Sequence, residues 1–163
     1  MHPDLLQLSL GTTRGLRIAD GWFAELAGHA GITVETVGVR VGATSRLRRA
    51  YPVTDLVEAL AARRAIASAL RRLEPRAVVF STTTASLLAD DLRLPYAVRL
   101  DSPARLNRPG LQNILLHALE RRKLANAVLV LPSSGMAAAS LPPEAAPVVV
   151  VPPPVFVHSG GQV

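Results

Sequence analysis

Short apolar runs alternate with segments of helical periodicity along almost the whole chain. Most of these runs are continuous, which is typical of strands buried on both faces of a parallel sheet. The predicted strands are residues 5–10, 32–41, 77–80, 96–100, 128–131 and 148–151. The predicted helices are residues 16–30, 52–73, 85–92 and 110–126, with a helical turn at 133–139. The sequence therefore predicts an α/β fold in which a parallel sheet of about six strands carries helices on both faces.

The composition limits the class of protein. A chain of 163 residues fits one domain, and with 49% hydrophobic and 18% charged residues it has enough apolar surface for a core. No apolar run reaches the roughly 18–20 residues of a membrane span, and Met1 to Asp4 lack the features of a secretory signal. The chain has no cysteine, which excludes disulfides and thiolate metal sites. We therefore expect a cytoplasmic protein.

Ligands of parallel α/β folds bind beyond the carboxyl ends of the strands, so the turns after the strands are the candidate sites. The first such turn reads Gly11, Thr12, Thr13, Arg14, Gly15. Its backbone amides and the following helix N-terminus suit a phosphate or sugar, and Arg14 adds a guanidinium. The spacing matches neither the dinucleotide fingerprint nor a P-loop. An ordinary strand-to-helix turn is the alternative, and spacing alone favours it.

Two further turns carry polar side chains. Ser81, Thr82 and Thr83 follow a buried strand, and their hydroxyls either hold a sugar or cap the next helix, with capping favoured on sequence alone. Arg99 and Asp101 end the next strand, with Arg105 and Arg108 behind them. In one interpretation, these charged residues bind a phosphate or orient a substrate hydroxyl. In the other, Arg99 and Asp101 form an internal ion pair that fixes the loop. The sequence leaves both interpretations open.

The net charge is +6, and almost every basic residue is arginine. Two clusters stand out, namely Arg40 with Arg46, Arg48 and Arg49, and the run from Arg121 to Lys123. A basic surface attracts an anionic partner such as phosphate, an acidic membrane or nucleic acid, although a GC-rich coding bias also explains the arginines. Aromatic residues are only 4% of the chain, which weighs against single-stranded nucleic acid, since that mode of binding needs stacking platforms.

Five segments, in order, resemble the N-terminal domain of a GT-B glycosyltransferase, nearest to glycosyltransferase family 4. They are LLQLSLGTTRGLRIADGWFAELAGHAGITVETV, LEPRAVVFSTTT, LPYAVRLDSP, HALERRKLANAVLVLPSSGMAAASL and APVVVVPPPV. Two positions depart from the family pattern. The motif usually written VPPGVD reads Val-Pro-Pro-Pro-Val-Phe here, and Ser81-Thr82-Thr83 stands where many members have a histidine.

The resemblance implies a Rossmann-like half-domain over residues 1–155, followed by a short tail at 156–163, with the donor-binding C-terminal domain absent. It implies retaining, metal-independent transfer of a sugar from a nucleotide-sugar to an acceptor, which in this family is often lipid-linked. We expect no cofactor, no metal and no catalytic residue in this chain. The substrate-binding candidates are Gly11, Thr12, Thr13, Arg14, Gly15, Ser81, Thr82, Thr83, Arg99 and Asp101.

On this interpretation the chain holds the acceptor, and a nucleotide-sugar binds only with a donor domain or a partner chain. The chain alone is expected to be inactive. One alternative is a non-catalytic docking subunit of a split glycosyltransferase. Another is a basic α/β module that binds nucleotide or nucleic acid, but the sequence contains no nucleic-acid-binding motif. Peripheral contact with the inner membrane face, through the arginine clusters, is a further expectation.

Overall fold

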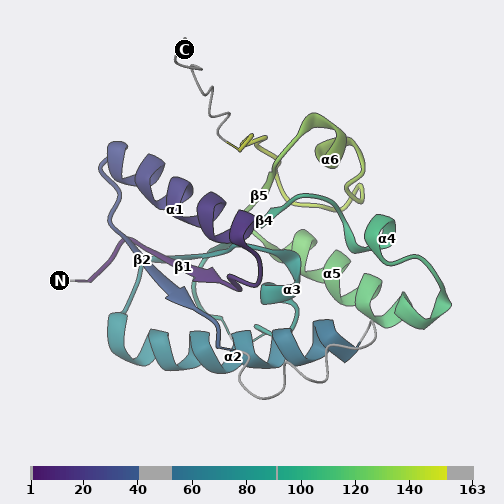
Figure 1. The fold of residues 1–163 in the computed structure, drawn as a ribbon, viewed down its shortest axis with the longest axis horizontal. Coiled ribbons are helices and arrows are strands. Elements are labelled where there is room, and N and C mark those ends of the chain that lie inside the picture. The colour runs from purple at the N-terminus through teal and green to yellow at the C-terminus, as the bar shows by residue number, and fades with distance from the viewer. Residues whose placement is uncertain (1, 41–52, 91, 154–163) are drawn as a thin grey trace, which may run out of the picture.

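The computed structural model describes residues 2–40, 53–90 and 92–153. Five parallel strands form one sheet in the order β2-β1-β3-β4-β5 (Figure 1). The strands are β1 (Leu5–Ser9), β2 (Val34–Gly38), β3 (Ala77–Phe80), β4 (Tyr96–Leu100) and β5 (Leu129–Pro132). The predicted α/β class, with a Rossmann-like parallel sheet, is confirmed. The basic loop predicted at residues 42–51 and the tail at 156–163 lie outside the described residues.

Helices cover both faces of the sheet, as predicted. The long helix α1 (Arg14–His29) lies on one face, and α2 (Val53–Leu73) and α5 (Ile114–Asn126) lie on the other (Figure 1). A 3-10 turn, η2 (Leu111–Asn113), leads into α5, and the short helices are α3 (Thr83–Ser86), α4 (Ala104–Asn107) and α6 (Gly135–Ala139). The helix predicted at 85–92 is thus much shorter and starts earlier, and α4 was not predicted.

The sixth predicted strand, 148–151, is not a strand of the sheet. It lies parallel to β5 but forms only an isolated bridge, between Val148 and Val130. The amides of Val149 and Val151 donate to the carbonyls of Val130 and Pro132, at 3.0 and 2.9 Å. Prolines at 147, 152 and 153 bound this segment, and because proline has no amide hydrogen they stop the ladder from extending. The sheet therefore has five strands rather than six.

Alternate strand residues pack on opposite faces of the sheet. Leu6, Leu8, Val78 and Phe80 belong to the main core, together with α2 residues such as Ile66 and with Leu124 of α5. The opposite face has a smaller cluster, in which Val79, Ala97 and Leu131 pack with Phe23 of α1. Helix α1 buries only Asp20 and Ala27, so it covers its face of the sheet more loosely than α2 does. The apolar core therefore lies mainly between the sheet and the pair α2 and α5.

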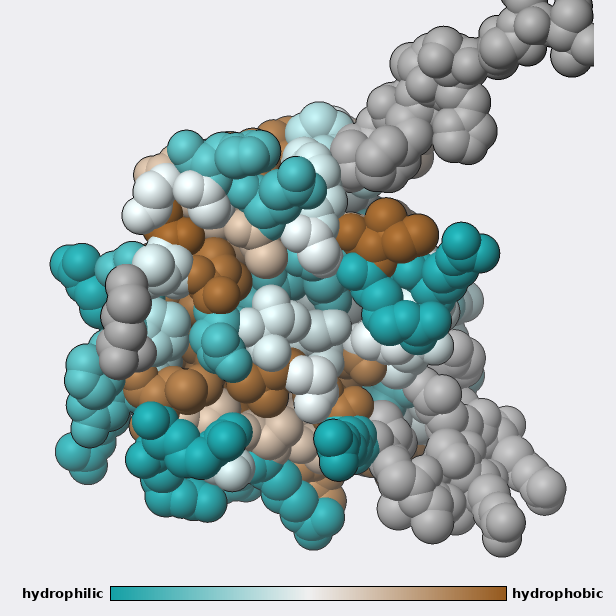
Figure 2. Space-filling view, turned by 60° about the vertical axis from the view of Figure 1, so that its left-hand side comes forward, coloured by the Kyte–Doolittle hydropathy of each residue, from teal (hydrophilic) through white to brown (hydrophobic). Residues whose placement is uncertain are grey.

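The surface toward the N-terminus and β2 is of mixed polarity. Figure 2 shows its hydrophobic residues in several separate groups, divided by hydrophilic ones. Ile18 and Leu26 of α1 are 48% and 46% exposed. Within the described residues, no helix is both long enough and apolar enough to cross a membrane.

Candidate functional site

A cleft of about 300 Å³ opens at the carboxyl ends of β3, β4 and β5, against the first turns of α1. We call it the carboxyl-end cleft. It is lined by Thr13, Gly15, Leu16, Ala19, Trp22, Ser81, Arg99, Leu100, Asp101, Leu131, Ser133, Val151 and Pro153. Five of the ten predicted substrate-binding residues are among them, because the carboxyl ends of parallel strands meet at one edge of the sheet. The other five, Gly11, Thr12, Arg14, Thr82 and Thr83, are not.

The β1–α1 turn is built as a helix start. Gly11 has a φ of 56°, which favours glycine, and its carbonyl accepts a hydrogen bond from Arg17 at 2.8 Å. Thr13 is the N-cap of α1, since its hydroxyl accepts from the Leu16 amide at 3.2 Å. Only Thr13 and Gly15 of this turn line the cleft, and Arg14 is exposed outside it. The geometry is that of the ordinary strand-to-helix turn.

The hydroxyls that follow β3 have partners within the chain. Ser81, 5% exposed, accepts from the Leu10 amide at 3.3 Å and also lines the cleft. Thr82 caps α3 by accepting from the Ala85 amide at 3.2 Å, which confirms the capping interpretation for this residue. The Thr83 hydroxyl hydrogen-bonds to the buried carboxylate of Glu120. Of these three residues, only Ser81 contributes to the cleft.

Arg99 forms a buried ion pair with Asp20 of α1, rather than the pair with Asp101 that was one of the two interpretations left open by the sequence. Its Nη1 donates to Asp20 Oδ1 at 2.9 Å, and the two side chains are 13% and 4% exposed. Nη2 donates to the Ala19 carbonyl at 3.3 Å, and the guanidinium lies 4.8 Å from the centre of the Phe23 ring. Burial lowers the pKa of Arg99, and the Asp20 carboxylate opposes that shift. Asp20 escaped prediction because it is 79 residues from its partner.

The Asp20 carboxylate joins α1 to β1 as well. It accepts a hydrogen bond from the Ser9 hydroxyl, and the Asp20 carbonyl accepts from Gln7 Nε2 at 3.1 Å. Gln7 and Ser9 are buried and alternate with the core leucines of β1. A polar layer formed by Gln7, Ser9, Asp20 and Arg99 therefore lies between α1 and the sheet, beneath the cleft.

Neither Asp101 nor Trp22 is hydrogen-bonded to this polar layer, although the Asp101 carboxylate acts to raise the pKa of Arg99. Asp101 is exposed, and no described residue donates a hydrogen bond to its carboxylate. Trp22, the single tryptophan of the chain, is half-buried in the cleft wall. The sequence did not mark Trp22 as a candidate binding residue. Its place in the cleft depends on how α1 lies over the strand ends, which periodicity does not reveal.

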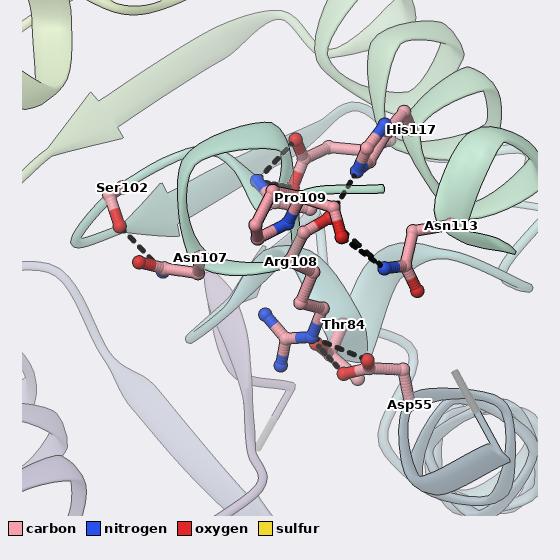
Figure 3. A network of polar contacts seen from close by, with 10 residues as sticks. Asp55, Thr84, Ser102, Asn107, Arg108, Pro109, Asn113 and His117 are labelled. Atoms are coloured by element: carbon pink, nitrogen blue, oxygen red, sulfur yellow. Dashed lines mark hydrogen bonds and ion pairs between the residues drawn. The ribbon is translucent and has the colours of Figure 1, made fainter. Parts of the chain in front are cut away.

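Arg108, one of the two arginines behind the third turn, is part of a second polar network, shown in Figure 3. The Arg108 guanidinium forms an ion pair with buried Asp55 of α2 (Nε to Oδ2 2.5 Å), and Thr84 donates to the same carboxylate at 3.2 Å. The Arg108 carbonyl accepts from Asn113 at 3.1 Å and lies 2.9 Å from His117 Nε2. Arg108 therefore fastens the β4–α5 connection to α2, and its guanidinium is already paired.

Glu120 of α5 holds the same β4–α5 connection through the start of α4. Its two carboxylate oxygens accept from the Ala104 amide at 2.8 and 3.0 Å, and the residue is 4% exposed. Burial raises the pKa of Glu120, while the hydrogen bonds from Ala104 and Thr83 oppose that shift. Arg105 donates to the Ser140 carbonyl at 2.9 Å. None of these side chains lines the carboxyl-end cleft.

The run Arg121 to Lys123 is largely neutralised. Arg121 pairs with Glu144, and Arg122 and Lys123 pair with Asp90 at 3.5 and 2.6 Å. The Lys123 side chain is only 6% exposed, and its hydrogen bond lowers the pKa of Asp90. Of the other predicted cluster, Arg40 is exposed, and Arg46, Arg48 and Arg49 lie outside the described residues. In the described part of the chain, no three His, Asp or Glu side chains gather as a metal site would need.

Comparison with solved structures shows a likeness to a glycosyltransferase. No protein-family model and no curated protein sequence matches the chain. The crystal structure of MurG from Acinetobacter baumannii, a GT-B glycosyltransferase, matches 96% of this chain with a TM-score of 0.54 and 18% sequence identity. The chain spans about half of MurG, 47% of its length. It therefore has the fold of one Rossmann-like half of MurG.

Proposed function

We propose that this chain is the acceptor-binding half of a glycosyltransferase that transfers a sugar from a nucleotide-sugar to an acceptor. The observation that carries the proposal is the likeness to half of MurG over 96% of the chain. The carboxyl-end cleft supports it, because it lies where ligands of open α/β sheets bind. A retaining, metal-independent course and membership of family 4 are parts of the proposal that rest on the sequence resemblance alone.

The contents of the cleft argue for the acceptor rather than the donor. A diphosphate needs free cationic groups or amides. Among the described lining residues, Arg99 already pairs with Asp20, and the Leu16 amide already donates to Thr13. The volume of about 300 Å³ is at the lower end of the roughly 300–1,000 Å³ typical of ligand sites, which is small for a nucleotide-sugar. The nucleotide-sugar is therefore assigned to a donor half, either a further domain or a partner chain.

The proposal predicts that the purified chain neither binds nor hydrolyses nucleotide-sugars by itself. Calorimetric titration with UDP, GDP and their sugar conjugates should give no saturable heat, and chromatography should show no released nucleotide. Steady hydrolysis of a UDP- or GDP-sugar by this chain alone would contradict an acceptor-only role. If sugar transfer occurs only after a second chain with a donor half is added, the result supports the alternative of a docking subunit in a split glycosyltransferase.

The nucleic-acid alternative loses much of its support from the structure. It rested on the two basic clusters. The run Arg121 to Lys123, which the structure describes, forms ion pairs with Glu144 and Asp90. Binding of duplex DNA that falls steeply with salt would restore it, because phosphate contacts release counterions. A shallow salt dependence, or no binding, is what the acceptor role predicts.

We also propose peripheral contact with the inner membrane face, as a lipid-linked acceptor would require. The supporting observation is apolar rather than basic. Leu106, Leu111, Ile114 and Leu115 are 56%, 83%, 60% and 65% exposed within one ten-residue stretch. Flotation with vesicles of anionic lipid should carry the chain upward, and Leu111→Ser with Leu115→Ser should abolish it. Met136→Ser, at an equally exposed residue outside this stretch, is the control. Equal flotation of all variants, or none by the wild type, would exclude the contact.

A further inference from the structure

The charge of the carboxyl-end cleft is unsuited to an anion. Arg99 and Asp101 are the charged residues that line it, and Asp20 directly behind Arg99 contributes a second carboxylate. One guanidinium and two carboxylates give a net charge of −1 for these three groups. The guanidinium is also occupied, since it donates to Asp20 and to the Ala19 carbonyl and lies over Phe23. Among the described lining residues a phosphate would therefore find no free cationic side chain, and only the N-terminus of α1 would attract it.

The free groups of the cleft suit a hydroxyl-rich ligand. The Asp101 carboxylate is exposed and receives no hydrogen bond from the described residues, and an ionised carboxylate only accepts. Its oxygens are therefore available to accept hydrogen bonds, which the hydroxyls of a sugar can donate. Hydrogen bonds to a charged acceptor are worth about twice those between neutral groups, so one such contact contributes substantially to a small ligand's affinity.

The remaining lining is apolar and of a size for one ring. Trp22 provides a large flat surface, and Leu16, Val151 and Pro153 extend the apolar lining. A pyranose is apolar on its C–H faces and polar at its rim, so it matches an aromatic wall beside a carboxylate. The volume of about 300 Å³ accommodates a single ring rather than a chain of them.

We propose that the carboxyl-end cleft binds one uncharged sugar ring, with a C–H face on Trp22 and hydroxyls donated to Asp101. This inference deepens the acceptor role proposed above and rests on it for its biological meaning. It adds two things: the chemical class of ligand, and two residues with distinct tasks. Trp22 supplies contact area, and Asp101 selects a ligand with hydroxyl donors over an anion.

The single tryptophan makes the proposal directly measurable. Trp22 emission is followed while the full chain is titrated with the methyl glycosides of glucose, galactose, mannose and N-acetylglucosamine, and separately with inorganic phosphate and pyrophosphate. We expect a saturable change with at least one glycoside and none with either anion. No saturable change with any of the four glycosides, or saturation by phosphate, would overturn the proposal.

Asp101→Asn tests the role of the carboxylate without changing the shape of the side chain. Asp101 is exposed, so the variant should fold, and it should bind the glycoside about tenfold more weakly or worse, as expected for a lost hydrogen bond to a charged group. Glu35→Gln, at an exposed carboxylate on the edge strand β2, is the matched control and should bind like the wild type. Equal weakening in both variants, or in neither, contradicts the assignment of Asp101.

A ligand-observed readout completes the test, because Trp22→Ala removes the fluorophore. Saturation-transfer NMR with the same glycoside should show loss of the signal from its ring protons in Trp22→Ala, and undiminished transfer there would overturn the stacking role. The two proposals fail separately. Absence of glycoside binding refutes the sugar cleft but not a transferase, whereas hydrolysis of nucleotide-sugars by the chain alone refutes the acceptor-only role but not the cleft.

Discussion

On the α2 and α5 side of the sheet, Leu6, Leu8, Val78 and Phe80 pack into one apolar core, whereas on the α1 side Gln7, Ser9 and Arg99 meet the Asp20 carboxylate. The same strands supply both sets, because successive side chains point to opposite faces. The apolar side provides stability through area removed from water. The polar side orders a helix over the strand ends with few apolar contacts, and the cleft opens there. In this chain, the larger apolar core and the cleft thus lie on different faces of one sheet.

The largest expected effect comes from breaking the polar side. Arg99→Met leaves the buried Asp20 carboxylate without its cationic partner, which should cost about 3–5 kcal/mol in the free energy of unfolding. Arg121→Met is the matched control, because its pair with Glu144 is exposed and should be worth under about 1 kcal/mol. Urea denaturation measures both. The double variant Asp20→Asn, Arg99→Met should regain part of the loss.

Equal losses in the free energy of unfolding for Arg99→Met and Arg121→Met would contradict the contrast between the two faces. The buried Arg99–Asp20 pair would then contribute no more than an exposed ion pair. If the double variant regains no stability, the unpaired Asp20 carboxylate is not the cause of the loss. The Ser9 hydroxyl and the surrounding helix would then be sufficient to stabilise that carboxylate. Either result is visible in the same set of urea curves.

Changing Val78 or Val79 to Ala compares how tightly the two faces of the sheet are packed. Val78 and Val79 are both nearly fully buried, Val78 in the main core and Val79 in the cluster near α1. Each change to Ala removes two carbons, worth about 1.6 kcal/mol before any cavity cost. The cavity cost depends on how well the site collapses, so Val78→Ala should be more destabilising by roughly 1 kcal/mol. A larger loss for Val79→Ala would mean that α1 packs as tightly as α2.

The smallest expected effect is on the pH dependence of stability and comes from Glu120, a buried carboxylate of α5 on the apolar side. Burial raises the pKa of Glu120 above its ordinary 4.5, so its protonated form favours the folded state. The resulting stability is present at low pH and is lost as the pH rises through the folded-state pKa. Glu120→Gln keeps an acceptor for the Ala104 amide but does not titrate. The variant should therefore gain stability relative to the wild type between pH 4 and pH 7, and a relative loss over that range would contradict the pKa direction.

Much of the frame could be predicted from the sequence, because it depends on local pattern. Continuous apolar runs located four of the five strands, and the alternation of apolar and polar residues located β2. The rule that sites follow strands placed Thr13, Ser81, Arg99 and Asp101 at one edge. The sixth run was apolar enough to be predicted as a strand. The prolines beside it limited its pairing, which an apolar count does not register.

The partners of charged residues could not be predicted. Arg99 pairs with Asp20, Arg108 with Asp55, and Lys123 with Asp90, each across a long stretch of sequence that folding brings together. Sequence neighbours gave no correct partner: Asp101 was one of two interpretations for Arg99, and the run Arg121 to Lys123 was predicted as part of a basic surface. The same limit hid Trp22, whose role depends on where α1 crosses the strand ends.

The central claim is that the α1 side of the sheet carries the ligand site, at the carboxyl-end cleft. Amide chemical-shift mapping tests it most directly, with the glycoside that gives the strongest Trp22 response. The account predicts that shifts concentrate at Thr13, Gly15, Asp101 and Ser133, and at the Trp22 indole N–H. The hollow beside Tyr96, Arg122 and Asn126 lies at the opposite ends of the strands and should stay unchanged. Shifts that concentrate in that hollow, or none in the cleft at saturation, would contradict the claim.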